Sequence, residues 1–131
     1  AQTMEAVICG YTEPRGSRKY FGALILGVYN NKKLTYIGHT GTGFSHLNQL
    51  NVFNLLKKHA VRVSPFTRPP KPNAPVTWLR PKLVCEVKFS QMTNDGILRH
   101  PVFMKLRDDK KAEEVTLRSQ LNKKQQTVIN G

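Results

Sequence analysis

Acidic residues are scarce in this sequence, and none occurs between Glu13 and Glu86. The whole chain has 8 Asp and Glu against 21 Lys and Arg, which gives a formal net charge of +13 at pH 7. A surface that served solubility alone would mix both signs of charge, so the long one-sign interval argues against that explanation. A chain built in this way is expected to bind a polyanion.

Long apolar runs, lipidation signals and basic amphipathic helices are also missing, which argues against a membrane surface as the polyanion. Nucleic acid is then the expected partner. The chain has only 2 cysteines, Cys9 and Cys85, with no CxxC pair and no His at metal-ligand spacing. We therefore expect no metal site and two small buried side chains. A reducing cytoplasm is expected, which the lack of a signal peptide also favours.

Runs of β-forming residues dominate the 131-residue chain, which is long enough for one domain. Alternating or continuous apolar patterns predict strands at 4–14, 21–29, 33–44 and 82–93. Between the second and third strands, Asn30 and Asn31 are expected to take left-handed geometry in a turn. The sequence NDG at 94–96 predicts a hairpin that leads into a fifth strand over 98–110.

The pattern changes period after the third strand. Ser45 is expected to cap a helix at its N-terminus. Lys57 and Lys58 are expected in its last turn, where the helix dipole stabilises cations. Its expected buried stripe is Leu47, Leu50, Phe53, Leu56 and Ala60. The following segment, 61–81, has 6 prolines and no acidic residue, so we expect an extended basic loop and no central strand. The segment after Lys110 is expected to be weakly helical and solvated.

The order of these elements predicts the fold class. Three strands, one helix and a two-stranded hairpin indicate a mainly β domain, a five-stranded OB-fold barrel with one helix between strands 3 and 4. An SH3-like barrel would lack the long helix after the third strand. OB folds often bind nucleic acid, in agreement with the charge.

Two long stretches carry a resemblance to a known family. The first, EAVICGYTEPRGSRKYFGALILGVYNNKKLTYIGHTGTGF, begins at Glu5, and the second, VTWLRPKLVCEVKFSQMTNDGILRHPVFMKLRDDK, ends at Lys110. Together they resemble the C-terminal OB domain of ATP-dependent DNA ligases, and most closely the ligase module of bacterial ligase D. That enzyme acts in non-homologous end joining. The second stretch ends in Arg-x-Asp-Lys, which resembles nucleotidyltransferase motif VI.

The resemblance also indicates what the chain lacks. Ligases of this family form a covalent adenylate on the lysine of a KxDG motif, and no KxDG occurs here. We therefore expect an excised OB domain over 1–115, inactive as a ligase by itself. A tail or interdomain linker is expected over 116–131, because its last residues, TVING, resemble the linker to the polymerase module in some ligase D proteins.

The resemblance assigns motif VI to the first step of ligation, in which a lysine attacks the α-phosphate of ATP and pyrophosphate leaves. That step builds negative charge, so the parent enzyme is expected to need cations and a divalent metal, Mg or Mn. Arginine offers phosphate a planar fork and lysine a point charge. The catalytic candidates are Arg99, Lys105, Arg107, Asp109 and Lys110. The alternative is a solvated strand end whose surface ion pairs contribute little.

A second group of residues is expected to contact DNA phosphates through side chains and backbone N–H groups. These candidates are Arg15, Gly16, Ser17, Arg18, Lys19, Thr40, Thr42, Lys57 and Lys58. The loop PRGSRKYFG is alternatively only a charged turn. The sequence HTGTGF has neither the spacing nor the lysine of a Walker motif, so its glycines are expected to allow a sharp bend.

The resemblance implies a domain that clamps duplex DNA at a nick or end and supplies motif VI to adenylation during DNA repair. The implied partners are the adenylation domain of the same chain, a polymerase module in cis and the end-binding protein Ku. The implied location is the bacterial cytoplasm, at the nucleoid. Two other interpretations stay open: a stand-alone OB module that binds single-stranded DNA or RNA, and the OB domain of an mRNA-capping enzyme.

Overall fold

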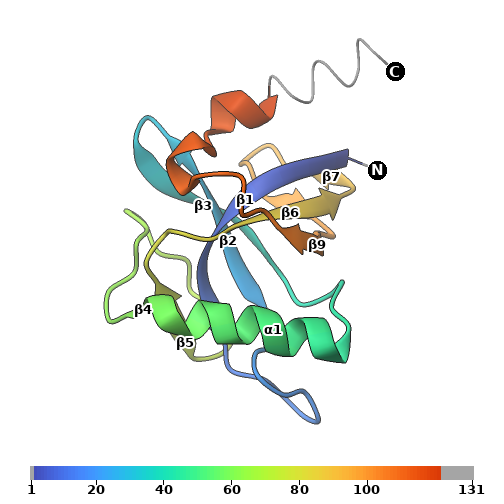
Figure 1. Ribbon diagram of the computed structural model, residues 1–131. Coiled ribbons are helices and arrows are strands. Elements are labelled where there is room, and N and C mark those ends of the chain that lie inside the picture. The colour runs from blue at the N-terminus through green and yellow to red at the C-terminus, as the bar shows by residue number, and fades with distance from the viewer. Residues whose placement is uncertain (1, 122–131) are drawn as a thin grey trace.

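The computed structural model describes residues 2–121 and consists mainly of β-strands (Figure 1). The strands are β1 (Gln2–Thr12), β2 (Leu24–Asn30), β3 (Lys33–Thr40), β4 (Ala60–Val61), β5 (Val76–Leu79), β6 (Val84–Phe89), β7 (Gln91–Met92), β8 (Leu98–Arg99) and β9 (Val102–Leu106). The α-helix α1 (His46–Leu56) lies between β3 and β4, and two 3-10 turns are η1 (Lys57–His59) and η2 (Ala112–Glu114). The mainly β class with a helix after the third strand is confirmed.

Strand β1 is the centre of the sheet. It pairs with β2 along one edge, and its other edge pairs with β6 over residues 2–7 and with β5 over residues 10–12. Strand β3 pairs with β2, and β9 pairs with β6, which gives the path β3-β2-β1-β6-β9. The two ends of this path meet where the Phe103 N–H donates to the Thr42 carbonyl over 3.0 Å. This order is the OB-fold order that the sequence predicts.

The strand count differs from the expected five. The predicted fourth strand ends at Phe89, and the chain continues as β7 in a separate two-stranded sheet with β8. The predicted fifth strand is interrupted between β8 and β9, because His100 has a φ of 55° and Pro101 has no N–H to donate. The NDG hairpin is confirmed, with Gly96 at a φ of 83° and the Thr93 N–H donating to the Ile97 carbonyl.

The turn between β2 and β3 is confirmed with a shift of one residue. Asn30 pairs with Lys33, and the two loop residues with positive φ are Asn31 and Lys32 rather than Asn30 and Asn31. Two positive φ values in a two-residue loop match the strand twist of a β-hairpin.

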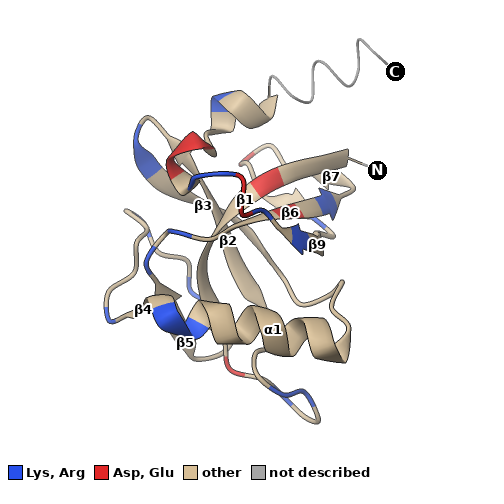
Figure 2. Ribbon diagram, viewed as in Figure 1, with Lys and Arg blue, Asp and Glu red and all other residues tan. Residues whose placement is uncertain are grey.

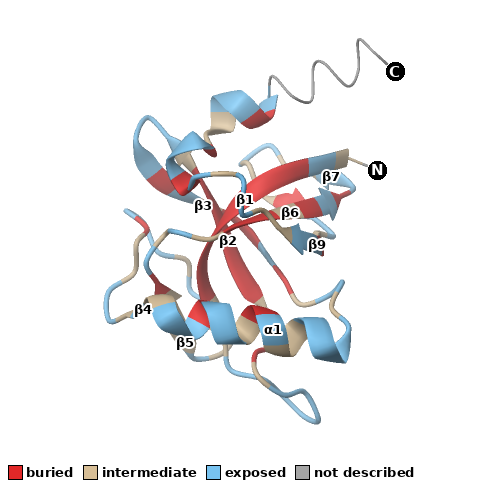
Figure 3. Ribbon diagram, viewed as in Figure 1, coloured by how far each residue is buried: buried red, intermediate tan, exposed pale blue. Residues whose placement is uncertain are grey.

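The core lies between the strands and α1, which crosses one end of the sheet (Figure 1). Buried residues concentrate in the strands, whereas the outer surface of α1 is exposed (Figure 3). Phe103 stacks on Phe44 with ring centroids 4.4 Å apart, and Phe44 meets Phe21 edge-on at 5.2 Å. Cys9 and Cys85 are buried and free, as expected, and burial raises the pKa of Cys85 to about 12.

The expected buried stripe of the helix is confirmed only in part. Leu56 is buried and Phe53 packs against the core, but Leu47 and Ala60 are exposed. Ser45 caps α1 as predicted, because its Oγ accepts from the Asn48 N–H over 3.1 Å. The buried helical residues are Val52 and Leu56, while Leu47 is 67% exposed. Ala60 lies beyond the helix in β4, and Lys57 and Lys58 belong to η1 instead of the last turn of α1. Leu47 and Leu55 are exposed on the side of α1 that faces away from the core.

The expectation that 61–81 contains no central strand is also wrong. Residues of β5 carry no proline, and this strand pairs with β1 on one edge and β4 on the other. Trp78 on β5 meets Phe66 edge-on at 6.0 Å and packs against the core. Five of the six prolines lie between β4 and β5, and Pro81 follows β5.

The segment after Lys110 is less solvated than expected. Ala112, Val115 and Gln120 are buried, and the Tyr29 N–H donates to the Val115 carbonyl over 2.9 Å. The Gln120 side chain accepts from the Glu5 N–H over 2.8 Å. The division between a domain over 1–115 and a linker over 116–131 stays a prediction, and this packing favours a boundary beyond residue 120. The TVING stretch lies outside the described residues.

Candidate functional site

Arg107, just after β9, is the centre of the segment that resembles motif VI. Its Nε and Nη2 each donate over 2.9 Å to the two carboxylate oxygens of Asp109, a bidentate pair. Its Nη1 lies 3.3 Å from a carboxylate oxygen of Glu5 and 3.3 Å from one of Glu86. One guanidinium therefore binds three carboxylates.

The strand register explains this arrangement. Glu5 on β1 and Glu86 on β6 are direct cross-strand partners, and Glu5 is buried at 6% exposure. Two like charges directly opposite each other destabilise a sheet, so Arg107 stabilises the fold by lying between them. Sequence reasoning missed both glutamates. The available signal was the presence of acids inside two strands that are otherwise rich in β-forming residues.

The bidentate contact also shifts the pKa values of both side chains. The hydrogen bond from Arg107 lowers the pKa of Asp109 from 3.8 to about 2, with a smaller contribution from the charge of Lys110. The pKa of Arg107 is raised, chiefly by its hydrogen bond to Asp109. Both groups are therefore charged throughout the physiological range.

The free energy of unfolding is expected to decrease in acid, over the pH range in which Asp109 becomes protonated. Because its folded pKa of about 2 lies below the ordinary 3.8, the unfolded state binds more protons. The resulting stabilisation is complete above pH 3.8 and is lost as the pH falls through about 2. At neutral pH, the wild type should unfold at a higher temperature than Asp109→Asn, and this difference should disappear as the pH falls. A difference that does not change with pH would mean that ionisation of Asp109 does not stabilise the fold.

The other motif VI candidates make fewer polar contacts than Arg107. Lys105 lies opposite Glu86 in the register and is exposed, and Lys110 follows the Arg107–Asp109 pair. Among residues 2–121, no Lys or Arg except Arg107 forms an ion pair. Arg99 lies on β8 in the separate small sheet, and no contact joins it to Arg107. The structure thus brings Arg107, Asp109 and Lys110 together but not Arg99.

The predicted DNA-contacting residues lie on several elements, and Lys and Arg are spread over several strands and loops of the domain (Figure 2). In the loop after β1, Arg15 donates to the Asn73 carbonyl and Arg18 donates to the Gly22 carbonyl over 2.7 Å. Gly16 turns this loop with a φ of 63°. Ser17 and Lys19 are exposed. The loop is therefore held by two arginine side chains whose charges stay uncompensated.

The remaining candidates divide into exposed and buried groups. Thr40 is buried, and its hydroxyl donates to the Pro101 carbonyl over 2.7 Å, so the structure argues against a DNA contact there. Thr42, Lys57 and Lys58 are exposed. Lys57 Nζ lies 5.2 Å from the centre of the Phe53 ring, a cation–π contact that holds this lysine at the surface.

Comparison with known families decides the class of this domain. The sequence model described as ATP dependent DNA ligase C terminal region matches residues 17–110. The chain belongs to this family. In a ligase C-terminal region, the arginine, aspartate and lysine gathered after β9 are the segment that the sequence resemblance identifies as motif VI.

The most similar relatives include proteins named multifunctional non-homologous end joining protein LigD. One from Pseudomonas aeruginosa is 46% identical over 117 residues, which cover 86% of this chain and 14% of the relative. One from Mycolicibacterium smegmatis is 41% identical over 116 residues, covering 86% of this chain and 15% of the relative. The chain therefore spans about a seventh of the length of these relatives.

Solved structures support the same assignment. The ligase domain of LigD from M. tuberculosis superposes with a TM-score of 0.81 at 34% identity, over 88% of this chain and 38% of that one. A mycobacterial DNA ligase D complexed with ATP and MES superposes with a TM-score of 0.76 at 32% identity, over 88% of this chain and 37% of that one. This chain thus has the fold of the part of a LigD ligase domain with which it superposes.

Two negative findings concern residues 2–121. No group of three His, Cys, Asp or Glu side chains in that range is arranged to hold a metal ion. No helix in that range is long and apolar enough to cross a membrane. The three carboxylates around Arg107 already bind a guanidinium, so they do not form a metal centre.

Proposed function

We propose that this domain belongs to an ATP-dependent DNA ligase that seals DNA breaks in non-homologous end joining. The observation that carries the proposal is the Arg107–Asp109 pair with Lys110, at the end of β9 in a ligase C-terminal region. Similarity to LigD proteins supports the end-joining role. The rest of the enzyme would supply the lysine nucleophile.

The domain would contribute its cations to the first step. A lysine on the adenylation domain attacks the α-phosphate of ATP. A phosphoramidate bond between the lysine and AMP forms, and the bond between the α-phosphate and pyrophosphate breaks. Negative charge grows on the leaving pyrophosphate, and cations placed there lower the barrier. Lys110 and Lys105 carry charges with no ion-pair partner among residues 2–121, so they suit phosphate oxygens. Asp109 and the two glutamates would position Arg107 beside them.

A metal does not fit this domain by itself, because residues 2–121 offer no suitable ligand group. The Mg or Mn that the family implies would enter with ATP at the adenylation domain. We assign no step to a metal held by the residues described for this domain.

The domain would also clamp duplex DNA through a different surface. Arg15, Arg18 and Lys19 in the loop after β1, with Lys57 and Lys58 in η1, lie on elements other than β9. Two basic surfaces suit two tasks, in which the domain closes on ATP and then turns to grip DNA around the break. The adenylation domain, a polymerase module and Ku would be its partners, at the bacterial nucleoid.

Binding of the chain to a nicked duplex, an intact duplex and a single strand across a salt series tests the DNA-clamping part of this proposal. We expect a preference for duplex and an affinity that falls steeply with salt, by a log–log slope of about −0.9 per phosphate contact. Arg18→Gln is expected to weaken binding to every duplex and to reduce the slope by about 1. Arg118→Gln, another exposed arginine, is the matched control and should change neither quantity.

A strong preference for single strands with no measurable duplex binding would contradict the clamp. That result would favour a module that binds single-stranded nucleic acid by stacking. Equal loss of binding in both arginine variants would mean that diffuse charge, and not the loop after β1, contacts the phosphates.

A further inference from the structure

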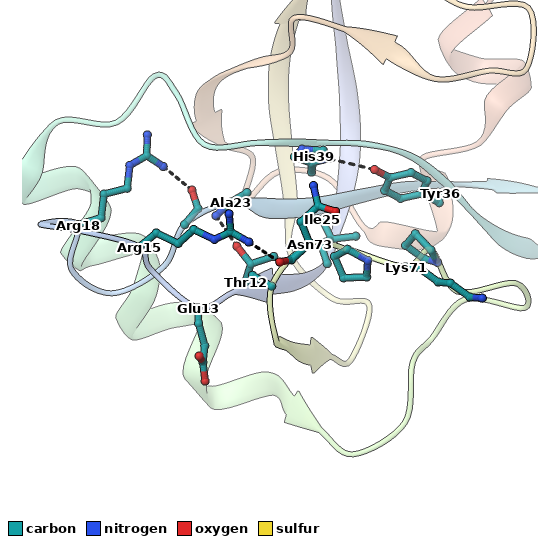
Figure 4. A pocket seen from close by; sticks show the side chains of 14 residues that line it. Thr12, Glu13, Arg15, Arg18, Ala23, Ile25, Tyr36, His39, Lys71 and Asn73 are labelled. Atoms are coloured by element: carbon teal, nitrogen blue, oxygen red, sulfur yellow. Dashed lines mark hydrogen bonds between the residues drawn. The ribbon is translucent and has the colours of Figure 1, made fainter.

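A groove of about 600 Å³ opens between the loop after β1 and the proline segment before β5 (Figure 4). One wall comes from Arg15 and Arg18, the other from residues 70–74, and the β2–β3 surface forms the floor with Tyr36 and His39. The hydrogen bond from Arg15 to the Asn73 carbonyl joins the two walls. This volume lies within the range of roughly 300–1,000 Å³ of small-ligand sites.

A β-bulge places the two ring side chains of the floor on one side of β3. In the register between β2 and β3, Leu26 pairs with Gly38 and Gly27 pairs with Tyr36, so Ile37 is an extra, unpaired residue. Residues three apart on a regular strand point to opposite faces, and the extra residue reverses this for Tyr36 and His39. The Tyr36 hydroxyl lies 3.0 Å from His39 Nδ1 (Figure 4).

The floor is also rigid at its apolar end. Tyr36 is half-buried and meets Phe66 edge-on at 6.1 Å, which fixes the orientation of its ring. His39 is exposed beside it. An aromatic ring fixed from behind, with an exposed imidazole next to it, forms a surface on which a planar ring can stack.

The charges of the groove are held in position without being neutralised. Arg15 and Arg18 donate to backbone carbonyls, which carry no net charge, and each guanidinium retains further N–H donors. Lys71 adds a third cation, against one acid, Glu13. Arg107 is the opposite case, since three carboxylates surround it. The groove is therefore prepared for an anion.

We infer that this groove binds a short single-stranded DNA segment, with a base against Tyr36 and His39 and its phosphates on Arg15, Arg18 and Lys71. Fixed cations beside a stacking surface are the combination that binds single strands. The groove volume of about 600 Å³ is large enough for one or a few nucleotides of a single strand. The inference rests on the proposed function and adds to it, because a broken end presents an unpaired overhang next to the duplex that the domain clamps.

Binding of the chain to a blunt duplex and to the same duplex with a short oligothymidine overhang tests the inference. We expect the overhang to increase affinity, and His39→Ala to remove at least about fivefold of that increase, as for one stacked base. Affinity for the blunt duplex should change little. His46→Ala, another exposed histidine outside the groove, is the matched control. Tyr36→Phe tests the hydroxyl contact while keeping the ring on Phe66.

The outcomes separate this inference from the proposed function. Equal affinity for blunt and overhang duplexes, or equal effects of the two histidine variants, would overturn the groove assignment and leave the clamp intact. Failure to bind any duplex or overhang would overturn both. A preference for the overhang that is lost in His39→Ala but kept in His46→Ala would support the groove. Unchanged thermal unfolding of His39→Ala would show that the loss is local.

Discussion

Lys110→Ala, in a ligase that carries this domain, is expected to slow formation of the lysine adenylate by about 10²–10³-fold, the effect of removing one preorganised charge-stabilising group. Lys110 follows the Arg107–Asp109 pair, and among residues 2–121 it has no ion-pair partner. Its charge is therefore available to the leaving pyrophosphate. The rate of adenylate formation from ATP measures this effect directly.

A second substrate separates catalysis from folding. Sealing of a nick whose 5′ phosphate already carries AMP bypasses the first step, so Lys110→Ala should change that rate little. Lys33→Ala, an exposed lysine at the start of β3, is the matched control and should change neither rate. Equal losses in both reactions would assign Lys110 to DNA binding or stability. No loss in either would leave the segment as a solvated strand end.

Gly43→Ala is expected to destabilise the domain by about 3 kcal/mol or more. Gly43 has a φ of 95°, and a Cβ built on it would lie 2.1 Å from the Phe103 carbonyl oxygen and 2.9 Å from the Phe103 nitrogen. That nitrogen donates to the Thr42 carbonyl, the bond at which the ends of the strand path meet. Both partners are backbone, so they cannot move aside cheaply. Urea unfolding of the chain measures the loss.

Gly96→Ala is the control for backbone conformation alone. Gly96 has a φ of 83°, but nothing lies within 4 Å of a Cβ at that position. Its cost should be about 1–2 kcal/mol, the penalty of a left-handed alanine. Equal costs at the two glycines would mean that the approach of Gly43 to β9 does not matter. The same result would remove the physical reason for the glycine-punctuated bend after β3.

Local pattern determined several features correctly, because each depends on neighbours in the sequence. Ser45 caps the helix through a residue three positions away, and NDG makes a hairpin within four residues. The alternation of Cys85, Val87 and Phe89 gives a buried face in β6. Composition alone indicates that the binding partner is a polyanion, since the net charge does not depend on the fold.

Tertiary contacts decided what the local pattern left ambiguous. The helix contains apolar residues on more than one side, and only the position of the sheet selects Val52 and Leu56 over Leu47. The high proline content of 61–81 led to the wrong prediction that this segment contains no central strand. Strand β5 is stabilised by pairing with β1 and β4 rather than by its own sequence. The bulge at Ile37 likewise exists only in the pairing of two strands.

The candidate site shows the same division. Sequence by itself determined the strongly basic character and the mainly β order, because these lie in composition and periodicity. The motif VI assignment of residues 107–110 comes from the family resemblance and stays a prediction. Only the tertiary structure decided that Arg107 binds Glu5 and Glu86, 102 and 21 positions away, and that Thr40 is buried. Ion pairs and grooves form between segments that the sheet register brings together, and that register depends on the packing of the whole chain.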